Sequence, residues 1–181
     1  SSARWHDGAR PRTLSTLVRA CCTTGSSTSA CSGGGTSAIG VDEKGLRSLA
    51  GKRVDAISRL AKYILLNLSG DNVWVFHLGM SGKLVCVAPN TARQKHDHII
   101  VDLDGGGELR YHDPRRFGLS LVAKKDRLLE LPQLRHVGLD PFDPALNGEY
   151  LFRFTRASDR RIRDLLLDQQ IVGGLGNIYA D

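Results

Sequence analysis

Two short segments contain the residue types with the most distinctive chemistry. Residues 77–82 read His-Leu-Gly-Met-Ser-Gly, and residues 113–118 read Asp-Pro-Arg-Arg-Phe-Gly. Each segment places an apolar side chain, Met80 or Phe117, close to an imidazole or guanidinium group. An apolar wedge beside a cation at a loop tip suits a protein that enters a base stack while it holds phosphates. On composition alone a simpler interpretation is commoner, in which both apolar residues end core strands and Arg115 pairs with the nearby aspartate.

A third segment lies close to the last residue. Residues 173–177 read Gly-Gly-Leu-Gly-Asn and interrupt a helical pattern. At the start of a new helix, Gly176 and Asn177 would offer main-chain N–H groups and a side-chain amide to an anion. The commoner use of an asparagine after a glycine turn is to cap the helix. These residues alone leave both interpretations open.

The remaining polar candidates have ordinary interpretations. Lys62 stands before an apolar run and matches an exposed lysine of a strand. His96 and His98 alternate, so a strand would place both on one face, where Asp113 or His112 would complete a metal site. No further His or Cys has ligand spacing, so the sequence disfavours a metal-dependent hydrolase and we expect no metal ligands in this chain.

The composition narrows the class of protein. Lysine and arginine total 25 against 19 acidic residues, which gives a formal net charge of +6 and a pI near 9.4. This balance is compatible with a polyanionic partner, although many solvated surfaces share it. The four cysteines form no Cys-x-x-Cys pair, which argues against a zinc ribbon and favours a reducing cytoplasm. No apolar run reaches the length of a membrane span, and no signal peptide is recognisable. The four cysteines are Cys21, Cys22, Cys31 and Cys86.

The first forty residues differ in composition from the rest. Residues 1–40 contain 8 Ser, 6 Thr and 6 Gly, and their only acidic residue is Asp7. No helical or strand period persists there, so the pattern predicts a linker or a disordered segment. Two interpretations are open: a flexible basic tail, or a segment that is not native, such as a wrong-frame translation of upstream DNA.

The remaining sequence predicts an α+β protein. Short β-like runs separated by tight turns indicate an antiparallel sandwich or barrel, and a proline-containing connector then leads to helices. Ser158 is the expected N-cap of the second helix, and Asn177 of a third, inside which the chain ends at Asp181; we therefore expect a C-terminal portion to be missing. The predicted strands cover residues 54–68, 72–78, 83–88, 98–104, 108–112 and 117–123, and the predicted helices cover residues 148–154 and 158–170.

From about Leu46 to Asp181 the chain resembles the bacterial formamidopyrimidine-DNA glycosylases. Three segments carry the resemblance: the complete motifs at residues 77–82 and 113–118, and residues 171–181, which read Ile-Val-Gly-Gly-Leu-Gly-Asn-Ile-Tyr-Ala-Asp. The resemblance implies an incomplete antiparallel β-sandwich domain over residues 41–135. The connector and the first part of a helix–two-turns–helix DNA-binding domain would occupy residues 136–181.

The resemblance assigns the wedge to three residues. Met80, Arg115 and Phe117 match side chains that fill the space left when a damaged nucleotide is swung out of the duplex. Unstacking costs a few kcal/mol, and an inserted side chain replaces part of the lost stacking. Arg115 would also hydrogen-bond the base left behind, because a guanidinium offers several donors in a rigid fork.

Other matches concern the DNA backbone. Lys62 corresponds to a catalytic lysine beside the target nucleotide's phosphates, which assists the strand-cleaving elimination. His77 and His96 correspond to DNA-contacting histidines, and Asn177 to the residue that clamps a phosphate. Ser158 departs from the pattern, because the family has a DNA-contacting basic residue there.

Five arginines surround that position. Arg160 and Arg161 are the substitutes we expect for the contact missing at Ser158, and Arg163 matches a family lysine; a solvated helix face explains the cluster equally well. The cluster consists of Arg153, Arg156, Arg160, Arg161 and Arg163.

The family resemblance implies base-excision repair of duplex DNA that contains oxidised bases, with removal of oxidised purines and AP-lyase strand cleavage by a monomeric bacterial enzyme in the cytoplasm. Family members begin Pro-Glu-Leu-Pro-Glu, where the proline amine attacks the sugar and the glutamate acts as the acid. No Pro-Glu pair occurs in this sequence, and the family's C-terminal zinc finger has no counterpart. We therefore expect no cofactor in this chain, zinc only in the missing finger, and little glycosylase activity from the chain as written.

Two alternatives stay within DNA repair. The chain could be a non-catalytic DNA-binding relative, which the missing Pro-Glu pair would suit. It could also belong to the endonuclease VIII-like glycosylases, which act on oxidised pyrimidines. The complete motifs at residues 77–82 and 113–118 favour the purine-repair branch.

Overall fold

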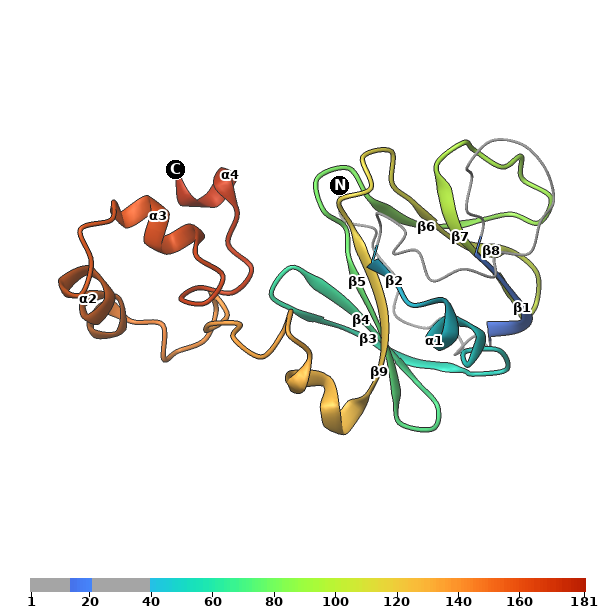
Figure 1. The fold of residues 1–181 in the computed structure, drawn as a ribbon, viewed down its shortest axis with the longest axis horizontal. Helices are drawn as coiled ribbons and strands as arrows, with labels where there is room; N and C mark the ends of the chain where they lie inside the picture. Colours follow the sequence, from blue (N-terminus) through green and yellow to red (C-terminus); the bar gives the residue numbers. More distant parts are fainter. Residues whose placement is uncertain (1–13, 21–39) are drawn as a thin grey trace.

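Two antiparallel sheets and a helical segment make up the described protein. The computed structural model describes residues 14–20 and 40–181. One sheet has the order β1-β7-β8-β6, and the other has the order β2-β9-β5-β4-β3, in which only the β2–β9 pair is parallel. Figure 1 shows the sheets on one side of the molecule and helices α2 to α4 on the other, joined by an irregular connector. The predicted α+β class, a sandwich followed by helices, is confirmed.

The elements have the following bounds. The strands are β1 (Leu14–Ala20), β2 (Gly40–Val41), β3 (Val54–Leu60), β4 (Tyr63–Leu68), β5 (Asn72–His77), β6 (Lys83–Val87), β7 (Asp97–Leu103), β8 (Glu108–His112) and β9 (Leu119–Lys124). The helices are α1 (Glu43–Arg47), the 3₁₀ helix η1 (Lys125–Glu130), α2 (Gly148–Arg156), α3 (Ile162–Leu167) and α4 (Asn177–Ala180). No helix within residues 14–20 and 40–181 is long and apolar enough to cross a membrane.

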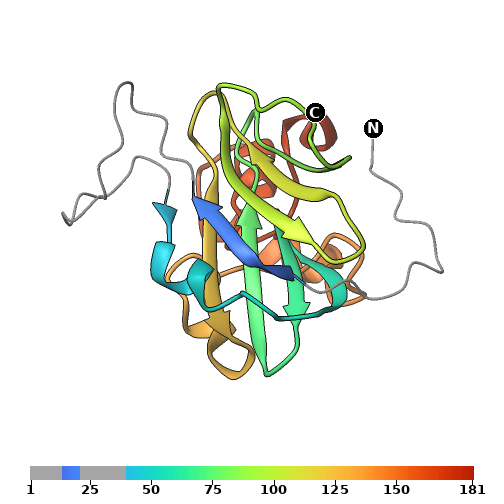
Figure 2. The same ribbon diagram turned by 90° about the vertical axis from the view of Figure 1, so that its right-hand side faces the viewer.

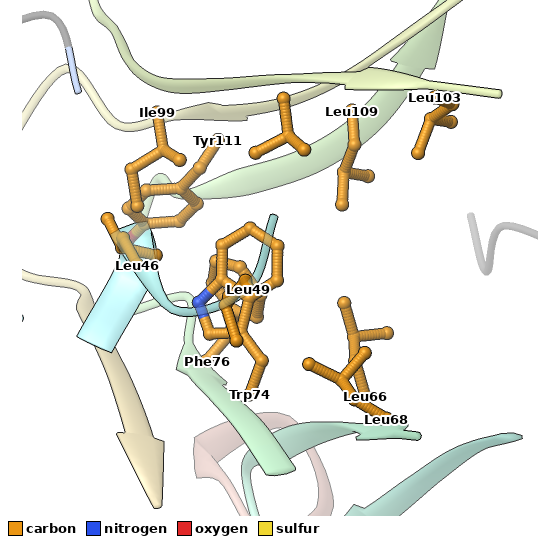
Figure 3. Close-up of a cluster of buried hydrophobic side chains, with 11 residues drawn as sticks. Leu46, Leu49, Leu66, Leu68, Trp74, Phe76, Ile99, Leu103, Leu109 and Tyr111 are labelled. Carbon is orange, nitrogen blue, oxygen red and sulfur yellow. The ribbon is translucent and has the colours of Figure 1, made fainter. Parts of the chain in front are cut away.

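The main core lies between the sheets. Apolar side chains of β4 and β5 face those of β7 and β8, with Leu46 and Leu49 from α1 and the turn after it closing one side (Figure 3). Trp74 is fully buried, and its indole N–H donates to the buried Ser120 hydroxyl at 2.9 Å. A buried indole N–H that lacks a partner is destabilising, so this hydrogen bond ties β5 to β9 inside the core.

The strand predictions were wrong in three places. Residues 54–68 form two strands instead of one, because Ala61 and Lys62 make a turn in which Ala61 has a φ of +51°. Helix α1 was not predicted, since five residues are too few for a clear helical period. Residues 14–20 form β1, which pairs with β7 beside the rest of its sheet (Figure 2), although the composition of this segment predicted no strand. The other residues of 1–39, with Cys21, Cys22 and Cys31, lie outside the described residues.

The helix ends also differ from the prediction. Helix α3 begins at Ile162 with Arg161 at its N-cap, while Ser158 accepts a hydrogen bond from the Arg160 N–H before the helix starts. Helix α4 is capped by Gly176, so Asn177 is its first residue and not its cap. Both errors have one cause: a capping residue is recognised by its side-chain hydrogen bond, which the sequence does not show.

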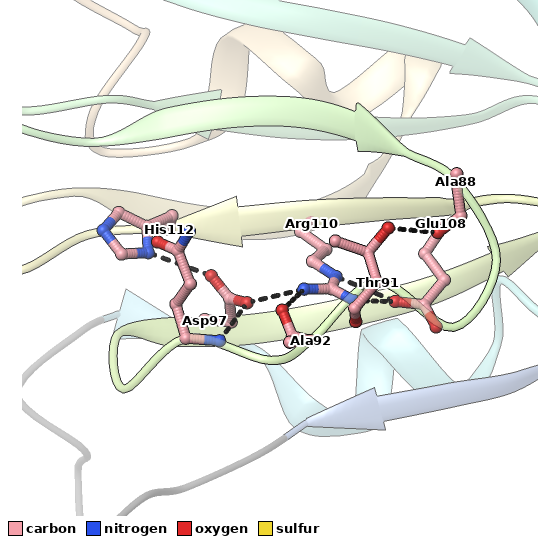
Figure 4. Close-up of polar contacts among 8 residues, drawn as sticks. Ala88, Thr91, Ala92, Asp97, Glu108, Arg110 and His112 are labelled. Carbon is pink, nitrogen blue, oxygen red and sulfur yellow. Dashed lines mark hydrogen bonds and ion pairs between the residues drawn. The ribbon is translucent and has the colours of Figure 1, made fainter.

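A network of buried charges lies in the sheet that contains β8. Arg110 is 2% exposed, and its guanidinium contacts the carboxylates of Asp97 and Glu108 at 3.1 and 2.7 Å. The same group donates to the main-chain carbonyls of Thr91 and Ala92 (Figure 4). Arg110 therefore holds the β6–β7 loop onto the sheet.

Asp97 is the second member of this network. Burial by itself would raise the pKa of Asp97, but the N–H of Gln94 and the side chains of His112 and Arg110 outweigh burial and hold this pKa below its usual 3.8. The stability that the ionised carboxylate contributes is complete above about pH 4 and is lost as the pH falls through the folded-state pKa.

We expect Asp97→Asn to lower the free energy of unfolding by about 3 kcal/mol at pH 7, because Arg110 loses a buried partner. The variant should also lose less stability than the wild type between about pH 4 and pH 2. Urea unfolding across this range measures both effects. Asp55→Asn is the matched control, since its ion pair with Arg53 is exposed and should change stability by less than about 1 kcal/mol. Equal effects of the two substitutions would contradict this prediction.

Candidate nucleic-acid interface

Two loops leave neighbouring strand ends and present the predicted wedge residues. The Met80 loop (residues 77–82) joins β5 to β6, and the Phe117 loop (residues 113–118) joins β8 to β9; both lie at the upper end of the sandwich in Figure 1. Met80 is 76% exposed and Phe117 is 63% exposed. The guanidinium of Arg115 lies 3.7 Å from the Met80 sulfur. The structure therefore brings all three residues to one surface, and the interpretation of Met80 and Phe117 as core residues is wrong.

The base of both loops contains the buried carboxylate of Asp113. It accepts hydrogen bonds from the Gly118 N–H at 2.8 Å, the Ser81 hydroxyl at 2.9 Å and the Arg115 N–H at 3.3 Å. Burial by itself would raise the pKa of Asp113, but these donors hold it below its usual value, so the group is ionised at neutral pH. Arg115 therefore contacts Asp113 through its main chain, and the ion pairs among the described residues include none between their side chains.

His77 begins the Met80 loop as a neutral hydrogen-bond donor. Burial, and then the positive charge of Lys62, lower the pKa of His77. The Gly79 N–H points at Nδ1 from 3.2 Å, so Nδ1 accepts and the proton of the neutral ring is on Nε2. An Nε2–H beside the exposed amine of Lys62 suits a contact to a phosphate oxygen.

The other histidines form a cluster beside the Phe117 loop. His96 is partly exposed, and its ring centroid lies 6.4 Å from that of His98 and 5.9 Å from that of His112. His98 donates through Nε2 to the Asp113 carbonyl at 2.8 Å, and His112 contacts the Asp97 carboxylate at 2.9 Å. Within the part of the chain that the structure describes, no group of three His, Cys, Asp or Glu residues could hold a metal ion. The arrangement leaves His96 as the cluster member free to face a ligand.

Lys62 lies next to the glycine-rich segment of the helical part. The turn that holds Lys62 packs against residues 173–176: a methyl group placed on Gly173 would lie 3.3 Å from Cβ of Ala61, and one placed on Gly176 would lie 3.9 Å from Nζ of Lys62. Arg59 reinforces this contact through an ion pair of 2.7 Å with Asp140 in the connector. Lys62 is thus in a turn and not on a strand, and the fold places its amine one residue from Asn177.

Asn177 is exposed at the start of α4, where Arg163 approaches it. The Asn177 side-chain oxygen lies 3.4 Å from Nη2 of Arg163, and Asp181 also pairs with this guanidinium. Arg160 forms an ion pair of 2.8 Å with Asp168, which occupies one of the two expected substitutes for the contact missing at Ser158. Arg161 is exposed, and no ion pair is printed between it and another described residue.

The sequence reasoning missed three positioning contacts. It did not find the pairing of Arg59 with Asp140, the approach of Arg163 to Asn177, or the capping of the glycine segment by Gln169, whose amide accepts from the Gly174 N–H and donates to the Leu175 carbonyl. An aspartate directly before a proline at a strand end was the one available signal for the buried role of Asp113. Contacts between distant segments leave no such local signal.

Family models match both parts of the chain. Residues 33–120 match the formamidopyrimidine-DNA glycosylase N-terminal domain, and residues 137–181 match the formamidopyrimidine-DNA glycosylase H2TH domain. Among curated relatives, the formamidopyrimidine-DNA glycosylase of Hahella chejuensis is 47% identical over 131 residues, or 72% of this chain and 48% of the relative. That of Moorella thermoacetica is 42% identical over 135 residues, or 75% of this chain and 49% of the relative. The chain therefore spans about half the length of these relatives.

Solved structures agree with these matches. The Lactococcus lactis formamidopyrimidine-DNA glycosylase bound to DNA that contains an AP site superposes with a TM-score of 0.70 at 32% identity, over 76% of this chain and 52% of the other. The same enzyme with DNA that contains FAPY-dG gives a TM-score of 0.71 at 32% identity, over 77% of this chain and 52% of the other. Both family models, the curated relatives and the solved structures agree, and the chain belongs to the formamidopyrimidine-DNA glycosylase family.

Proposed function

We propose that the protein acts in base-excision repair of duplex DNA that contains oxidised bases. The complete protein would remove oxidised purines, such as 8-oxoguanine and formamidopyrimidines, and cleave the strand at the resulting AP site. The observation that carries this proposal is the meeting of Met80, Arg115 and Phe117 on one exposed surface. Exposed apolar side chains at loop tips are unfavourable in water unless they have a binding role, and a gap in a base stack provides one.

The wedge residues have separate chemical tasks in this proposal. Met80 and Phe117 occupy the space of the displaced nucleotide, which offsets part of the unstacking free energy. Arg115 directs its fork of N–H donors at the base that remains in the opposite strand. Because the Met80 sulfur lies against the Arg115 guanidinium, the two side chains enter the duplex together.

The phosphate contacts come from both parts of the fold. Lys62 and the Nε2–H of His77 bind phosphates beside the displaced nucleotide, His96 contacts the backbone next to the Phe117 loop, and Asn177 clamps a phosphate from the helical part. Lys62 also assists the elimination that cleaves the strand. Its amine is exposed and lies beside the glycine-rich segment, so it is accessible to DNA held by Asn177.

A second candidate function is DNA binding without excision. The sequence has no Pro-Glu pair, and an amine nucleophile followed by a carboxylic acid is the pair that breaks the glycosidic bond in this family. A non-catalytic relative would keep the wedge and the phosphate contacts. In both cases we propose a monomer that works on DNA in the bacterial cytoplasm, with residues 41–135 and 136–181 as its two domains.

Excision assays on a duplex with a single 8-oxoguanine, followed by gel detection of strand cleavage, separate the two candidates. Cleavage that depends on Lys62 supports the enzyme, whereas specific binding without cleavage supports the non-catalytic relative. Absence of any preference for damaged over intact duplex contradicts both.

Substitutions in the wedge and in the clamp should have different effects. We expect Arg115→Ala and Phe117→Ala each to lower the preference for an abasic-site duplex over an intact duplex by about tenfold, because lost stacking is worth about 1–3 kcal/mol per base. Asn177→Ala should weaken binding to both duplexes by about tenfold and leave the preference unchanged, because a phosphate contact does not sense the base. Fluorescence anisotropy with the two duplexes measures these affinities.

Exposed residues away from the loops serve as controls. Phe142 is 88% exposed in the connector, so Phe142→Ala removes an aromatic ring without touching the wedge. Gln133→Ala removes an exposed amide in the same way. If the three site variants shifted both affinities in parallel, the separate roles would be wrong.

Binding should also weaken steeply with salt. With on the order of four to six phosphate contacts, the slope of log K against log [KCl] should be about −4 to −5. Lys62→Met should make this slope about one unit shallower, whereas Lys125→Met, on η1, should leave it unchanged. Titrations between about 50 and 200 mM KCl suffice, and an unaltered slope in Lys62→Met would exclude a phosphate contact by Lys62.

A further inference from the structure

Asp113 contacts every loop that carries a proposed DNA-contacting side chain of the sandwich. Its carboxylate accepts from Ser81 in the Met80 loop and from Gly118 in the Phe117 loop. Its main-chain N–H donates to the His96 carbonyl at 3.0 Å, and its own carbonyl accepts from His98. One residue, 0% exposed, therefore joins three loops that are far apart in the sequence.

The two wedge loops also touch directly, at positions where only glycine fits. A Cβ placed on Gly79 would lie 2.8 Å from the carbonyl carbon of Phe117, and the φ of Gly79 is +59°. A Cβ placed on Gly118 would lie 1.5 Å from the Tyr111 hydroxyl, which in turn lies 3.4 Å from the Asp113 carboxylate. Because the two main chains are in contact, a shift of one loop must displace the other.

The environment of the carboxylate makes this arrangement stiff. Asp113 is ionised and buried, and its charge is balanced by N–H and O–H donors that come from the loops themselves. Charge-assisted hydrogen bonds are stronger than neutral ones, and a buried charge that loses its donors is strongly destabilised. Each loop is thus stabilised in the position that keeps its donor on Asp113.

We propose that Asp113 is a positioning residue that couples the two halves of the wedge, so that Met80 on one side and Arg115 with Phe117 on the other enter the duplex as one unit. Ser81 is the link to the Met80 loop, and Gly118 is the link to the Phe117 loop. The coupling lowers the ordering entropy that two independent loop tips would lose on insertion. This inference rests on the proposed function, because it assumes that both tips enter DNA.

A double-mutant cycle tests the coupling. The measured quantity is the ratio of affinities for an abasic-site duplex and an intact duplex, for Met80→Ala, Phe117→Ala and the double variant, first in the wild-type background and then with Ser81→Ala. In the wild-type background the double variant should lose about fivefold less preference than the product of the single losses, because the second tip is already displaced. With Ser81→Ala the losses should multiply, since the Met80 loop no longer follows Asp113.

Further variants separate positioning from simple stabilisation. Ser81→Thr keeps a hydroxyl and should restore the coupling, and Asp113→Asn, which lacks the full charge, should abolish it as Ser81→Ala does. Thr155→Ala, which removes an exposed hydroxyl of α2, should leave the coupling unchanged. A merely structural role would change urea stability without changing whether the losses multiply.

The outcomes distinguish this inference from the proposed function. Coupling that disappears in Ser81→Ala and returns in Ser81→Thr supports the role of Asp113. Coupling of unchanged size in Ser81→Ala and Asp113→Asn overturns that role while the proposed function stands. A wild-type chain that binds abasic and intact duplexes equally overturns the proposed function, and the inference with it.

Discussion

The packing of Phe76 against Tyr111 joins the two sheets at the end of the sandwich from which both wedge loops depart. Their ring centroids lie 5.6 Å apart, and each residue stands next to the last position of its strand. Such aromatic pairs contribute about 0.5–1.5 kcal/mol beyond the apolar area they bury. Because the Met80 loop follows Phe76 and the Phe117 loop follows Tyr111, the separation of the wedge residues depends on this contact between sheets.

A second contact relates the sandwich to the helical part. Ala61, with its positive φ, packs on Gly173 and Gly174, and Arg59 pairs with Asp140. The close approach of main chains places Lys62 beside the residues that precede Asn177. A side chain larger than hydrogen at Gly173 would push the two parts away from each other, so the spacing of the phosphate contacts depends on these glycines.

The structure divides the charged residues into two groups. Arg110 and Asp97 are buried in one network that holds the β6–β7 loop, so they contribute to stability and are not accessible to DNA. Lys62 and Arg115 are exposed, and their charges face the solvent next to the wedge loops. The net charge of +6 therefore says little about the interface, because its effect depends on which cations are exposed and unpaired.

Local patterns in the sequence were enough to predict the α+β class, the strands from Asn72 onward and the two wedge motifs, since alternation, turn residues and short motifs are properties of neighbouring residues. They did not predict β1, whose pairing with β7 is a long-range interaction, or the division of residues 54–68 by the turn at Ala61. They also interpreted Met80 and Phe117 as core residues as readily as exposed ones. Only the tertiary structure decided that point, because the exposure of a loop tip depends on which distant segments cover it. The same reason applies to Asp113, whose donors come from loops that folding alone brings together.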